Sequence, residues 1–360
     1  MDEFNCRTKI YAGAGAIGKL GEFGAKRVFL VTDPYFYKNG MAQKIAEASK
    51  AEPVEIFHEI QPDPTVELVA RGTGRLKEFG ADLMVALGGG SAMDAAKAMG
   101  YFAQGKTRLV AIPTTSGSGS EVTDFAILTH NKVKHPLVDK SLRPWAAILD
   151  SDLLVNLPPS LIADAGFDVI AHGLEALAAT GAGVFSDALA REAVRSVVQN
   201  LPASFAGNTS VRLSVHQAAT MAGMAFSQAG LGLCHAMAHS LGGLFHVPHG
   251  RLNAILLPSI VTANAHVVGH KYAELARFVG MGASADAMAV RNLKNGLIRL
   301  RKELKLPETL AQAGVAPRDV QNAAQEIVKA TLEDPCCKTN PVKVEGFLVH
   351  QILEEVMGRG

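Results

Sequence analysis

Short apolar runs alternate with amphipathic segments over the first 150 residues of the chain. A segment such as VELVARGTGRLKEFG (66–80) carries its apolar residues at helical spacing. Continuous apolar strands that alternate with such helices are typical of a parallel sheet covered on both faces. We therefore predict an α/β domain, with strands in VFLVTD (28–33), PVEIFH (53–58), DLMVALGGG (82–90), LVAIPTT (109–115) and AAILD (146–150).

The pattern changes after LPPS (157–160). From there to the C-terminus the chain is rich in alanine and its apolar residues have helical periodicity. No run of residues in this part has the pattern of a β-strand. The sequence therefore predicts two domains, an α/β domain over 1–155 and an all-helical domain over 156–360. Because ligand sites form preferentially where domains meet, we expect the functional site in the cleft between the two halves.

Composition excludes several classes of protein. The chain has 360 residues, of which 48% are hydrophobic and 19% charged, so it can bury a large core. A net charge of +1, without Lys/Arg runs interleaved with aromatic residues, makes a nucleic-acid partner unexpected. The start MDEFNCRTK does not resemble a signal peptide, and no stretch of about 18 uninterrupted apolar residues could span a bilayer. We expect a cytoplasmic protein without a membrane partner.

The four cysteines do not indicate a disulfide framework or a structural zinc site. They form no CxxC pair, and neighbouring cysteines such as Cys336 and Cys337 have poor disulfide geometry. Reduced thiols are the expected state.

The segment GAGAIG (13–18) matches the GxGxxG fingerprint of dinucleotide-binding loops, with Asp33 at the expected distance downstream. However, the preceding KIYA is too short and polar for a buried first strand. The helix that should follow contains three glycines, each of which costs about 1 kcal/mol. A turn is therefore the favoured interpretation, with a dinucleotide loop as the alternative.

A second glycine-rich segment has a better context for phosphate binding. GGGSAMDAAKA (88–98) follows the apolar strand LMVAL and opens a good helix, so the backbone N–H groups at its start would face an anion. IPTTSGSGSEVT (112–123) repeats the arrangement after another strand, and Asp33 also ends a strand. Because ligands of open α/β sheets bind at the carboxyl ends of strands, these loops predict one nucleotide site. Its residues are Asp33, Gly89, Gly90, Ser91, Thr114, Thr115 and Ser118.

Histidines are concentrated in LGLCHAMAHSLGGLFHVPHG (231–250). His235 and His239 are four residues apart, as are Asp168 and His172 in AGFDVIAHGLEAL (165–177), so each pair shares a helix face. His249 follows a GG and a Pro that can turn the chain back. One carboxylate with several imidazoles and no thiolate suits Fe(II) or Zn(II) with a coordination position open to substrate. His246 falls outside the pattern and is expected to line the cleft or lie at the surface.

The motifs together resemble those of a known family. GGGSAMDAAK, IPTTSGSGSEVT, GFDVIAHGLEA, GLCHAMAHSLGG and VPHGRLNAILLP are similar to the iron-containing (group III) alcohol dehydrogenases from about residue 8 to the C-terminus. QPDPT (61–65), AGMAFSQAGLGLCHAMAH (222–239) and KTNP (338–341) look most like the propanol and ethanol dehydrogenases of propanediol- and ethanolamine-utilisation microcompartments. The resemblance implies a Rossmann-like parallel-sheet domain followed by a helical domain, the fold shared with dehydroquinate synthase.

The resemblance also assigns roles to individual residues. It makes Asp168, His172, His235 and His249 the metal ligands and puts His239 on the substrate side near the nicotinamide. Asp33 would face the adenosine ribose, and Asp94 would support the pyrophosphate turn at Gly89, Gly90 and Ser91. Lys134, in KHPLV, would complete the cofactor pocket with Thr114, Thr115 and Ser118.

The function implied is an NAD-dependent alcohol dehydrogenase that uses Fe2+, or alternatively Zn2+, and acts on short primary alcohols and aldehydes such as propionaldehyde or acetaldehyde. A zinc-dependent polyol or glycerol dehydrogenase and a lyase similar to dehydroquinate synthase are the alternatives. The lyase should line its pocket with Lys and Arg, whereas 231–250 contains neither. A scaffold protein without catalysis would leave the metal residues unexplained. We further expect a homodimer and, on the resemblance alone, a location inside a microcompartment beside its other enzymes.

Overall fold

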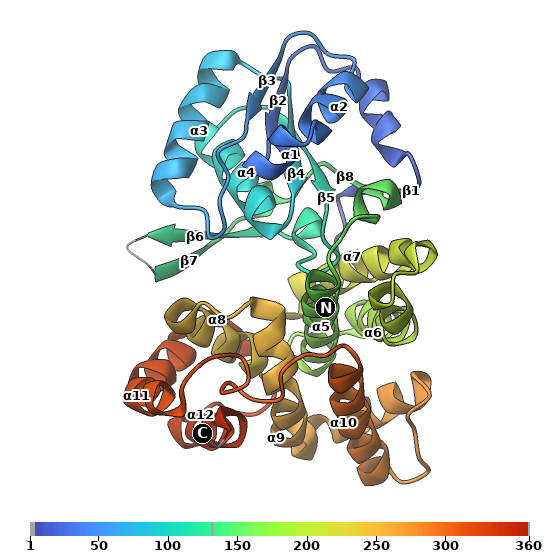
Figure 1. The fold of residues 1–360 in the computed structure, drawn as a ribbon, viewed down its shortest axis with the longest axis vertical. Helices are drawn as coiled ribbons and strands as arrows, with labels where there is room; N and C mark the ends of the chain where they lie inside the picture. Colours follow the sequence, from blue (N-terminus) through green and yellow to red (C-terminus); the bar gives the residue numbers. More distant parts are fainter. Residues whose placement is uncertain (1–3, 131–132, 359–360) are drawn as a thin grey trace. The chain divides into compact units, whose positions relative to one another are not determined.

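The computed structural model describes residues 4–130 and 133–358, which form two compact units (Figure 1). The first unit comprises residues 5–130 and 133–157, and the second comprises residues 158–358 together with Phe4. Phe4 joins the second unit by stacking on Phe185, with the ring centroids 5.4 Å apart.

A six-stranded parallel sheet forms the centre of the first unit. Its strands lie in the order β1-β8-β5-β4-β2-β3, and each pairs in parallel with its neighbours. The carboxyl ends of all six strands therefore lie at one edge of the sheet, where the loops after β2, β4 and β5 begin. The strands are β1 (Lys9–Gly13), β2 (Val28–Val31), β3 (Val54–Phe57), β4 (Leu83–Gly88), β5 (Arg108–Pro113) and β8 (Ala146–Asp150).

Helices cover both faces of this sheet, as the continuous apolar strands predict. Alternate side chains of a strand point to opposite faces, so β2 contributes Val28 and Leu30 to one core and Phe29 and Val31 to the other. The first core includes residues of α2 and of the 3-10 helix η1, and the second includes residues of α3 and α4. The bounds are η1 (Ala16–Glu22), α2 (Met41–Ala48), α3 (Val66–Phe79) and α4 (Gly90–Ala103).

All five strands predicted from apolar runs are present, but the structure contains three more. KIYA, judged too short and polar for a buried first strand, belongs to β1, which lies at the edge of the sheet and is partly exposed. The other two are β6 (Phe125–His130) and β7 (Val133–Val138), which form a separate antiparallel pair. An edge strand or a two-stranded pair does not need a continuous apolar run, because one side of it faces solvent.

The GAGAIG segment runs from the end of β1 into η1 rather than into an α-helix. The carboxylate of Asp150 accepts hydrogen bonds from the backbone N–H groups of Gly15 at 3.1 Å and Ile17 at 2.9 Å. A pyrophosphate would need such N–H groups, so the structure agrees with the interpretation of this segment as a turn.

The second unit is built from helices, and no β-strand lies within 158–358. Its longest helix, α9, is kinked at Val268 and is mostly buried in the unit. Among the described residues, α9 alone is long and apolar enough to cross a membrane, a test that the core helix of a globular protein also passes. The helices are α5 (Pro159–Ala178), α6 (Val184–Phe205), α7 (Arg212–Ala229), α8 (Leu233–Phe245), α9 (His249–Phe278), α10 (Asp286–Glu303), α11 (Pro317–Glu333) and α12 (Gly346–Met357).

Candidate metal centre and nucleotide site

Three helices of the second unit bring one carboxylate and three imidazoles together. Asp168 and His172 lie one turn apart on α5, His235 lies on α8, and His249 is the first residue of α9. The Oδ1 atom of Asp168 lies 3.8 Å from the Nε2 atom of His172, 3.6 Å from that of His235 and 3.4 Å from that of His249. The four residues predicted as metal ligands therefore form one cluster.

The spacing of these atoms fits a metal ion. Two atoms that each lie about 2.1 Å from a tetrahedral ion are about 3.4 Å apart. Asp168, His235 and His249 offer ligand atoms within 4.8 Å of one another, and the ring of His172 stacks on that of His235 with the centroids 4.5 Å apart. The buried Nε2 atom of His235 has no hydrogen-bond partner. A carboxylate and neutral imidazoles are a donor set that both Fe2+ and Zn2+ accept.

The charges in the cluster favour a cation. Burial alone would raise the pKa of Asp168, but the imidazoles of His172, His249 and His235 hold it well below its usual range. Burial lowers the pKa of His235, yet the carboxylates of Asp168 and Glu175 beside the ring raise it to about 9. An imidazole between two carboxylates thus attracts positive charge, which a metal ion can supply in place of a proton.

Two residues that contact this cluster were not predicted. Asn253 donates a hydrogen bond from Nδ2 to Oδ1 of Asp168 at 2.8 Å, and Oε2 of Glu175 lies 2.5 Å from Nδ1 of His235. Both are almost completely buried. Helical spacing could have suggested them, because Asn253 follows His249 by one turn and Glu175 follows Asp168 by two.

His239 lies beside the metal cluster without belonging to it. Its ring stacks on that of His249 with the centroids 5.2 Å apart, and its Nδ1 atom lies 2.9 Å from Oδ2 of Asp334. Oδ1 of Asp334 accepts a hydrogen bond from the backbone N–H of Cys336 at 2.8 Å, which fixes the carboxylate. Asp334 was also missed by sequence reasoning. His246 is exposed at the end of α8.

The start of α9 is fastened to α5 near the metal cluster. Arg251 donates hydrogen bonds from Nε and Nη2 to the carboxylate of Asp164 at 3.2 and 3.1 Å. Between His249 and Arg251 stands Gly250, where a Cβ atom would lie only 1.9 Å from the backbone oxygen of Asp164. The close approach that glycine permits therefore helps to hold His249 near Asp168.

The residues predicted to bind the nucleotide come together at the carboxyl edge of the sheet in the first unit. Gly88 ends β4 with a φ of 151°, which L side chains rarely adopt, and a Cβ there would lie 3.9 Å from Oδ2 of Asp33. A Cβ on Gly89 would lie 3.3 Å from Oγ1 of Thr115, and one on Gly90 would lie 3.5 Å from Oγ of Ser118. The loops after β2, β4 and β5 are therefore adjacent.

The N-terminus of α4 has no capping side chain of its own, so its backbone N–H groups are suited to a ligand. Gly89 is the N-cap of this helix and provides no side-chain hydrogen bond to it. Ser91 lies in the first turn, and the backbone N–H of Thr114 bonds to the oxygen of Gly88 at 2.9 Å. Helix N-termini without a capping side chain are suited to bind phosphate.

Asp94 and Lys134, which were also predicted to belong to the cofactor pocket, both make polar contacts within the protein. The carboxylate of Asp94 accepts from Oγ of Ser120 at 2.7 Å and from the backbone N–H of Ile127 at 3.0 Å, so it supports the loop after β5. Lys134, on β7, pairs with Asp63 at 2.8 Å.

A buried lysine that sequence reasoning missed also holds the loop after β5. The Nζ atom of Lys97 donates to Oγ of Ser120 at 2.8 Å, to Oγ1 of Thr123 at 2.8 Å and to the oxygen of Phe125 at 2.9 Å. Burial lowers the pKa of Lys97 to about 8. This lysine and Asp94 are thus structural supports of the loop that carries the predicted hydroxyl groups.

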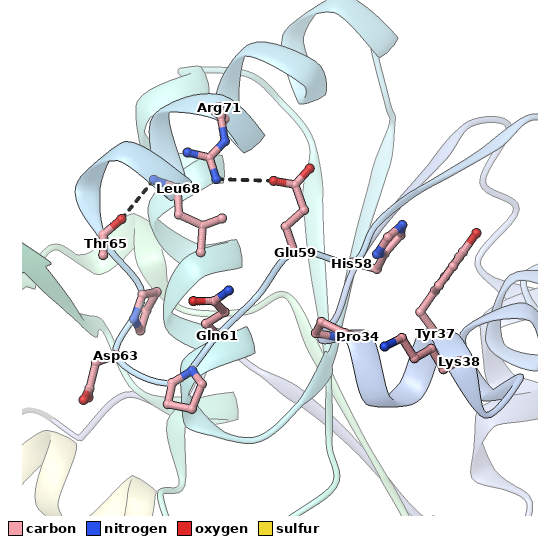
Figure 2. A pocket seen from close by; sticks show the side chains of 12 residues that line it. Pro34, Tyr37, Lys38, His58, Glu59, Gln61, Asp63, Thr65, Leu68 and Arg71 are labelled. Atoms are coloured by element: carbon pink, nitrogen blue, oxygen red, sulfur yellow. Dashed lines mark hydrogen bonds and ion pairs between the residues drawn. The ribbon is translucent and has the colours of Figure 1, made fainter. Parts of the chain in front are cut away.

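A cavity of about 500 Å³ lies in the same unit, between α1 (Pro34–Lys38) and the segment that leads from β3 to α3 (Figure 2). Asp33 is the N-cap of α1 and accepts a hydrogen bond from the backbone N–H of Phe36 at 3.0 Å. Tyr37 and His58 stack in the cavity wall with their rings 3.8 Å apart, and Arg71 bonds to Glu59 at 3.3 Å. The cavity therefore has aromatic and polar walls.

Family models match both halves of the chain. The model described as iron-containing alcohol dehydrogenase matches residues 7–151, and the model for the C-terminal part of the Fe-containing alcohol dehydrogenase family matches residues 162–357.

Similar proteins cover almost the whole chain. The chain is 37% identical to 1-propanol dehydrogenase PduQ of Salmonella typhimurium, over 99% of this chain and all of that protein. It is 33% identical to an NADPH-dependent butanol dehydrogenase of Clostridium saccharobutylicum, over 98% of this chain and 97% of the relative.

Solved structures of alcohol dehydrogenases and an oxidoreductase are also similar to this chain over nearly its whole length. A 1,3-propanediol oxidoreductase has a TM-score of 0.94 at 30% identity, and it covers 99% of this chain and 100% of its own. The iron-containing alcohol dehydrogenase of Thermococcus thioreducens has a TM-score of 0.91 at 32% identity, over 98% of this chain and 99% of its own.

These matches confirm the predicted fold class and reaction type, and they give no support to a polyol dehydrogenase or a lyase. The chain belongs to the iron-containing alcohol dehydrogenase family, and it is a metal-dependent alcohol dehydrogenase whose family uses Fe2+ and NAD(H).

Proposed function

We propose that this enzyme interconverts short primary alcohols and their aldehydes, with 1-propanol and propionaldehyde or ethanol and acetaldehyde as substrates. The observation that carries the proposal is the cluster of three imidazoles around the Asp168 carboxylate, together with similarity to a 1-propanol and a butanol dehydrogenase. In the oxidising direction, NAD+ held by the first unit would supply the acceptor for the hydride that the alcohol carbon loses, and the hydroxyl proton would be released.

The residues that would hold the metal ion are Asp168, His172, His235 and His249. When bound there, the ion would supply Lewis-acid polarisation of the substrate oxygen. Asn253 and Glu175 orient two of these side chains through hydrogen bonds. A cluster held in this way needs little rearrangement when an ion binds.

His239 would accept the proton that the alcohol loses. Its Nδ1 atom is 2.9 Å from Asp334, so a proton held at Nδ1 leaves Nε2 as the atom that can take up the substrate proton. Its side chain is 29% exposed, which allows it to pass the proton on to solvent. An imidazole suits this role because one ring nitrogen can take up a proton while the other keeps its own.

The first unit would hold the dinucleotide. We infer that the pyrophosphate binds at the start of α4, near Gly89, Gly90 and Ser91, with the hydroxyl groups of Thr115 and Ser118 beside it. Thr114 would add a third hydroxyl group, and Lys134, which pairs with Asp63 in the cavity wall, would complete the pocket. Asp33 would bind the adenosine ribose, since a carboxylate accepts hydrogen bonds from ribose hydroxyls. The cavity beside α1 then suits the adenosine end of the cofactor, because Asp33 caps that helix.

The charges near the metal cluster argue for an uncharged substrate. Arg251 is the cation of the VPHGRLNA motif, and it already pairs with Asp164 through two hydrogen bonds. An enzyme for a phosphorylated sugar acid would need cations available to the substrate. The C2 to C4 alcohols are uncharged and need no cation in their binding site.

Steady-state oxidation of NADH with C2 to C4 aldehydes tests the proposal. We expect turnover with acetaldehyde, propionaldehyde and butyraldehyde by the Fe2+-loaded enzyme. Turnover with glycerol or another polyol but none with these aldehydes would contradict the substrate assignment.

Cofactor choice should depend on Asp33. If its carboxylate lies beside the ribose, it repels the 2′-phosphate of NADP, and like charges in contact cost several kcal/mol. Asp33→Gly should therefore raise catalytic efficiency with NADP relative to NAD by about tenfold or more, since 1.4 kcal/mol corresponds to tenfold.

Glu59→Gln is a control for this variant, because Glu59 lines the cavity beside α1 but follows β3 rather than β2. It removes the same charge and should leave the NAD to NADP ratio closer to that of the parent enzyme. Equal shifts in the two variants, or an unchanged ratio in Asp33→Gly, would move the ribose contact away from Asp33.

Several features stay predictions from the sequence. They are the domain boundary near residue 155, a shared cleft between the domains, a homodimeric state and a cytoplasmic or microcompartment location. Size-exclusion chromatography with light scattering would determine the oligomeric state.

A further inference from the structure

Glu175 is a buried carboxylate whose contacts are concentrated on the helix that carries His235. It lies on α5 with 2% of its side chain exposed. Its Oε1 atom accepts a hydrogen bond from the backbone N–H of Cys234 at 2.6 Å, and Oε2 accepts one from the backbone N–H of His235 at 3.3 Å. The same Oε2 atom is 2.5 Å from Nδ1 of the His235 ring. Glu175 therefore binds both the backbone and the ring of His235.

The start of α8 depends on two side chains that are distant in sequence. Gly232 is the N-cap and provides no side-chain hydrogen bond, while Oδ1 of Asn340 accepts from the backbone N–H of Leu233 at 3.1 Å. Glu175 accepts from the next two N–H groups. A Cβ on Gly232 would lie 2.8 Å from both Asn340 and Glu175, so glycine is needed for their approach. Asn340 and Glu175 thus share the capping of one helix, but only Glu175 bonds to the His235 ring among the described hydrogen bonds.

The bond to the ring selects which nitrogen is available to a metal. A neutral imidazole has one N–H, and a carboxylate at Nδ1 keeps the hydrogen there. Nε2 then keeps its lone pair, and this atom is buried without a hydrogen-bond partner and lies 3.6 Å from Oδ1 of Asp168. Glu175, His172 and Asp168 occupy successive turns of α5, so the bond also ties the helix with two of the proposed ligands to the helix with a third.

We propose that Glu175 is a positioning residue for metal binding, which holds His235 with its Nε2 atom directed at the ion. The proposal rests on the proposed metal site. An acceptor at Nδ1 fixes the orientation of a ligating imidazole and raises the basicity of the other nitrogen, and loss of such a partner lowers metal affinity by about 10–100-fold.

Glu175→Gln tests this role because it keeps the size of the side chain and removes the charge. We would titrate Zn2+ into metal-free enzyme in competition with a chromophoric chelator. The parent should bind one Zn2+ per chain, and Glu175→Gln should bind it about 10–100-fold more weakly. NADH binding, measured by fluorescence, should be the same in both proteins.

Asn340→Ala is the matched control for a purely structural role, since Asn340 caps the same helix without a described bond to the His235 ring. This variant should melt at a lower temperature in its metal-free state, but it should bind Zn2+ nearly as tightly as the parent at temperatures where it is folded. Glu175→Asp, which keeps the charge but shortens the reach, should still bind more weakly than the parent.

Each result decides the proposal. Parent-like Zn2+ affinity in Glu175→Gln, or an equal loss of affinity in Asn340→Ala, would overturn the role of Glu175 while leaving the metal site intact. Parent-like affinity in Glu175→Asp would show that charge alone is required and would also overturn positioning. A parent enzyme that binds no Zn2+ would overturn the proposed metal site and the role of Glu175 with it.

Discussion

His235→Ala should lose both the bound metal ion and alcohol dehydrogenase turnover. The Nε2 atom of His235 lies 3.6 Å from Oδ1 of Asp168. The centroid of the His235 ring is 4.5 Å from that of His172 and 5.2 Å from that of His249. Removal of the ring therefore takes away a central donor of the cluster. The remaining three donors would hold an ion more weakly. We expect turnover at the limit of detection and metal content well below one ion per chain by elemental analysis.

His270→Ala provides the control for this variant, because His270 is an exposed histidine on α9 outside the cluster. It should keep both metal and turnover. Full metal occupancy in His235→Ala would show that this histidine is not a ligand.

His239→Ala should fold, keep its metal and bind NADH, but its turnover should fall by about 10²-fold or more, as general acid-base catalysis contributes about 10²–10⁴-fold. The reason is that His239 is held by Asp334 at 2.9 Å and stacks beside His249, where its ring can exchange a proton with the substrate. Turnover, metal content and NADH affinity measured on one preparation would separate these effects.

Two results would contradict this role for His239. Loss of metal in step with turnover would make His239 a ligand. Turnover close to that of the parent, with the His270→Ala control unchanged, would make it a structural residue of the α8 surface.

The central strands could be predicted because a strand that is buried on both faces needs a continuous apolar run. β1 and the β6–β7 pair could not, because they pair on fewer sides and carry polar residues. Lys9–Gly13 is an edge strand with exposed positions, and β7 contains Pro136, a residue that sheets tolerate at their edges. Periodicity therefore located five strands of the sheet, including β3 at one edge, but it missed β1 at the other edge and the separate β6–β7 pair.

The residues of the metal cluster could be predicted because four-residue spacings put pairs on one helix face. Their hydrogen-bond partners come from distant parts of the chain: Glu175 is 60 residues from His235, Asn253 is 85 from Asp168, and Asp334 is 95 from His239. Such pairs form only when helices pack. Helical spacing can therefore put Glu175 and Asn253 on the same helix face as a ligand, but it cannot identify the residues to which they bond. They are nevertheless the residues that hydrogen-bond to the proposed catalytic ring and to two of the proposed ligands.

The choice between the two glycine-rich loops also depended on context. GAGAIG matches the dinucleotide fingerprint in its letters, yet Asp150 occupies its backbone N–H groups. GGGS follows a central strand and opens α4, with Asp33 and Thr115 close by. The strand and helix around a motif were thus more informative than the motif alone.

The central claim is that turnover requires one metal ion per chain in the Asp168 cluster. The most direct test is to remove metal with a chelator, add Fe2+ back anaerobically in steps, and follow NADH oxidation with propionaldehyde together with iron content. We predict that turnover disappears with the metal and returns in proportion to bound iron until each chain holds one ion. An enzyme that reduces propionaldehyde at its full rate when free of metal would contradict the account.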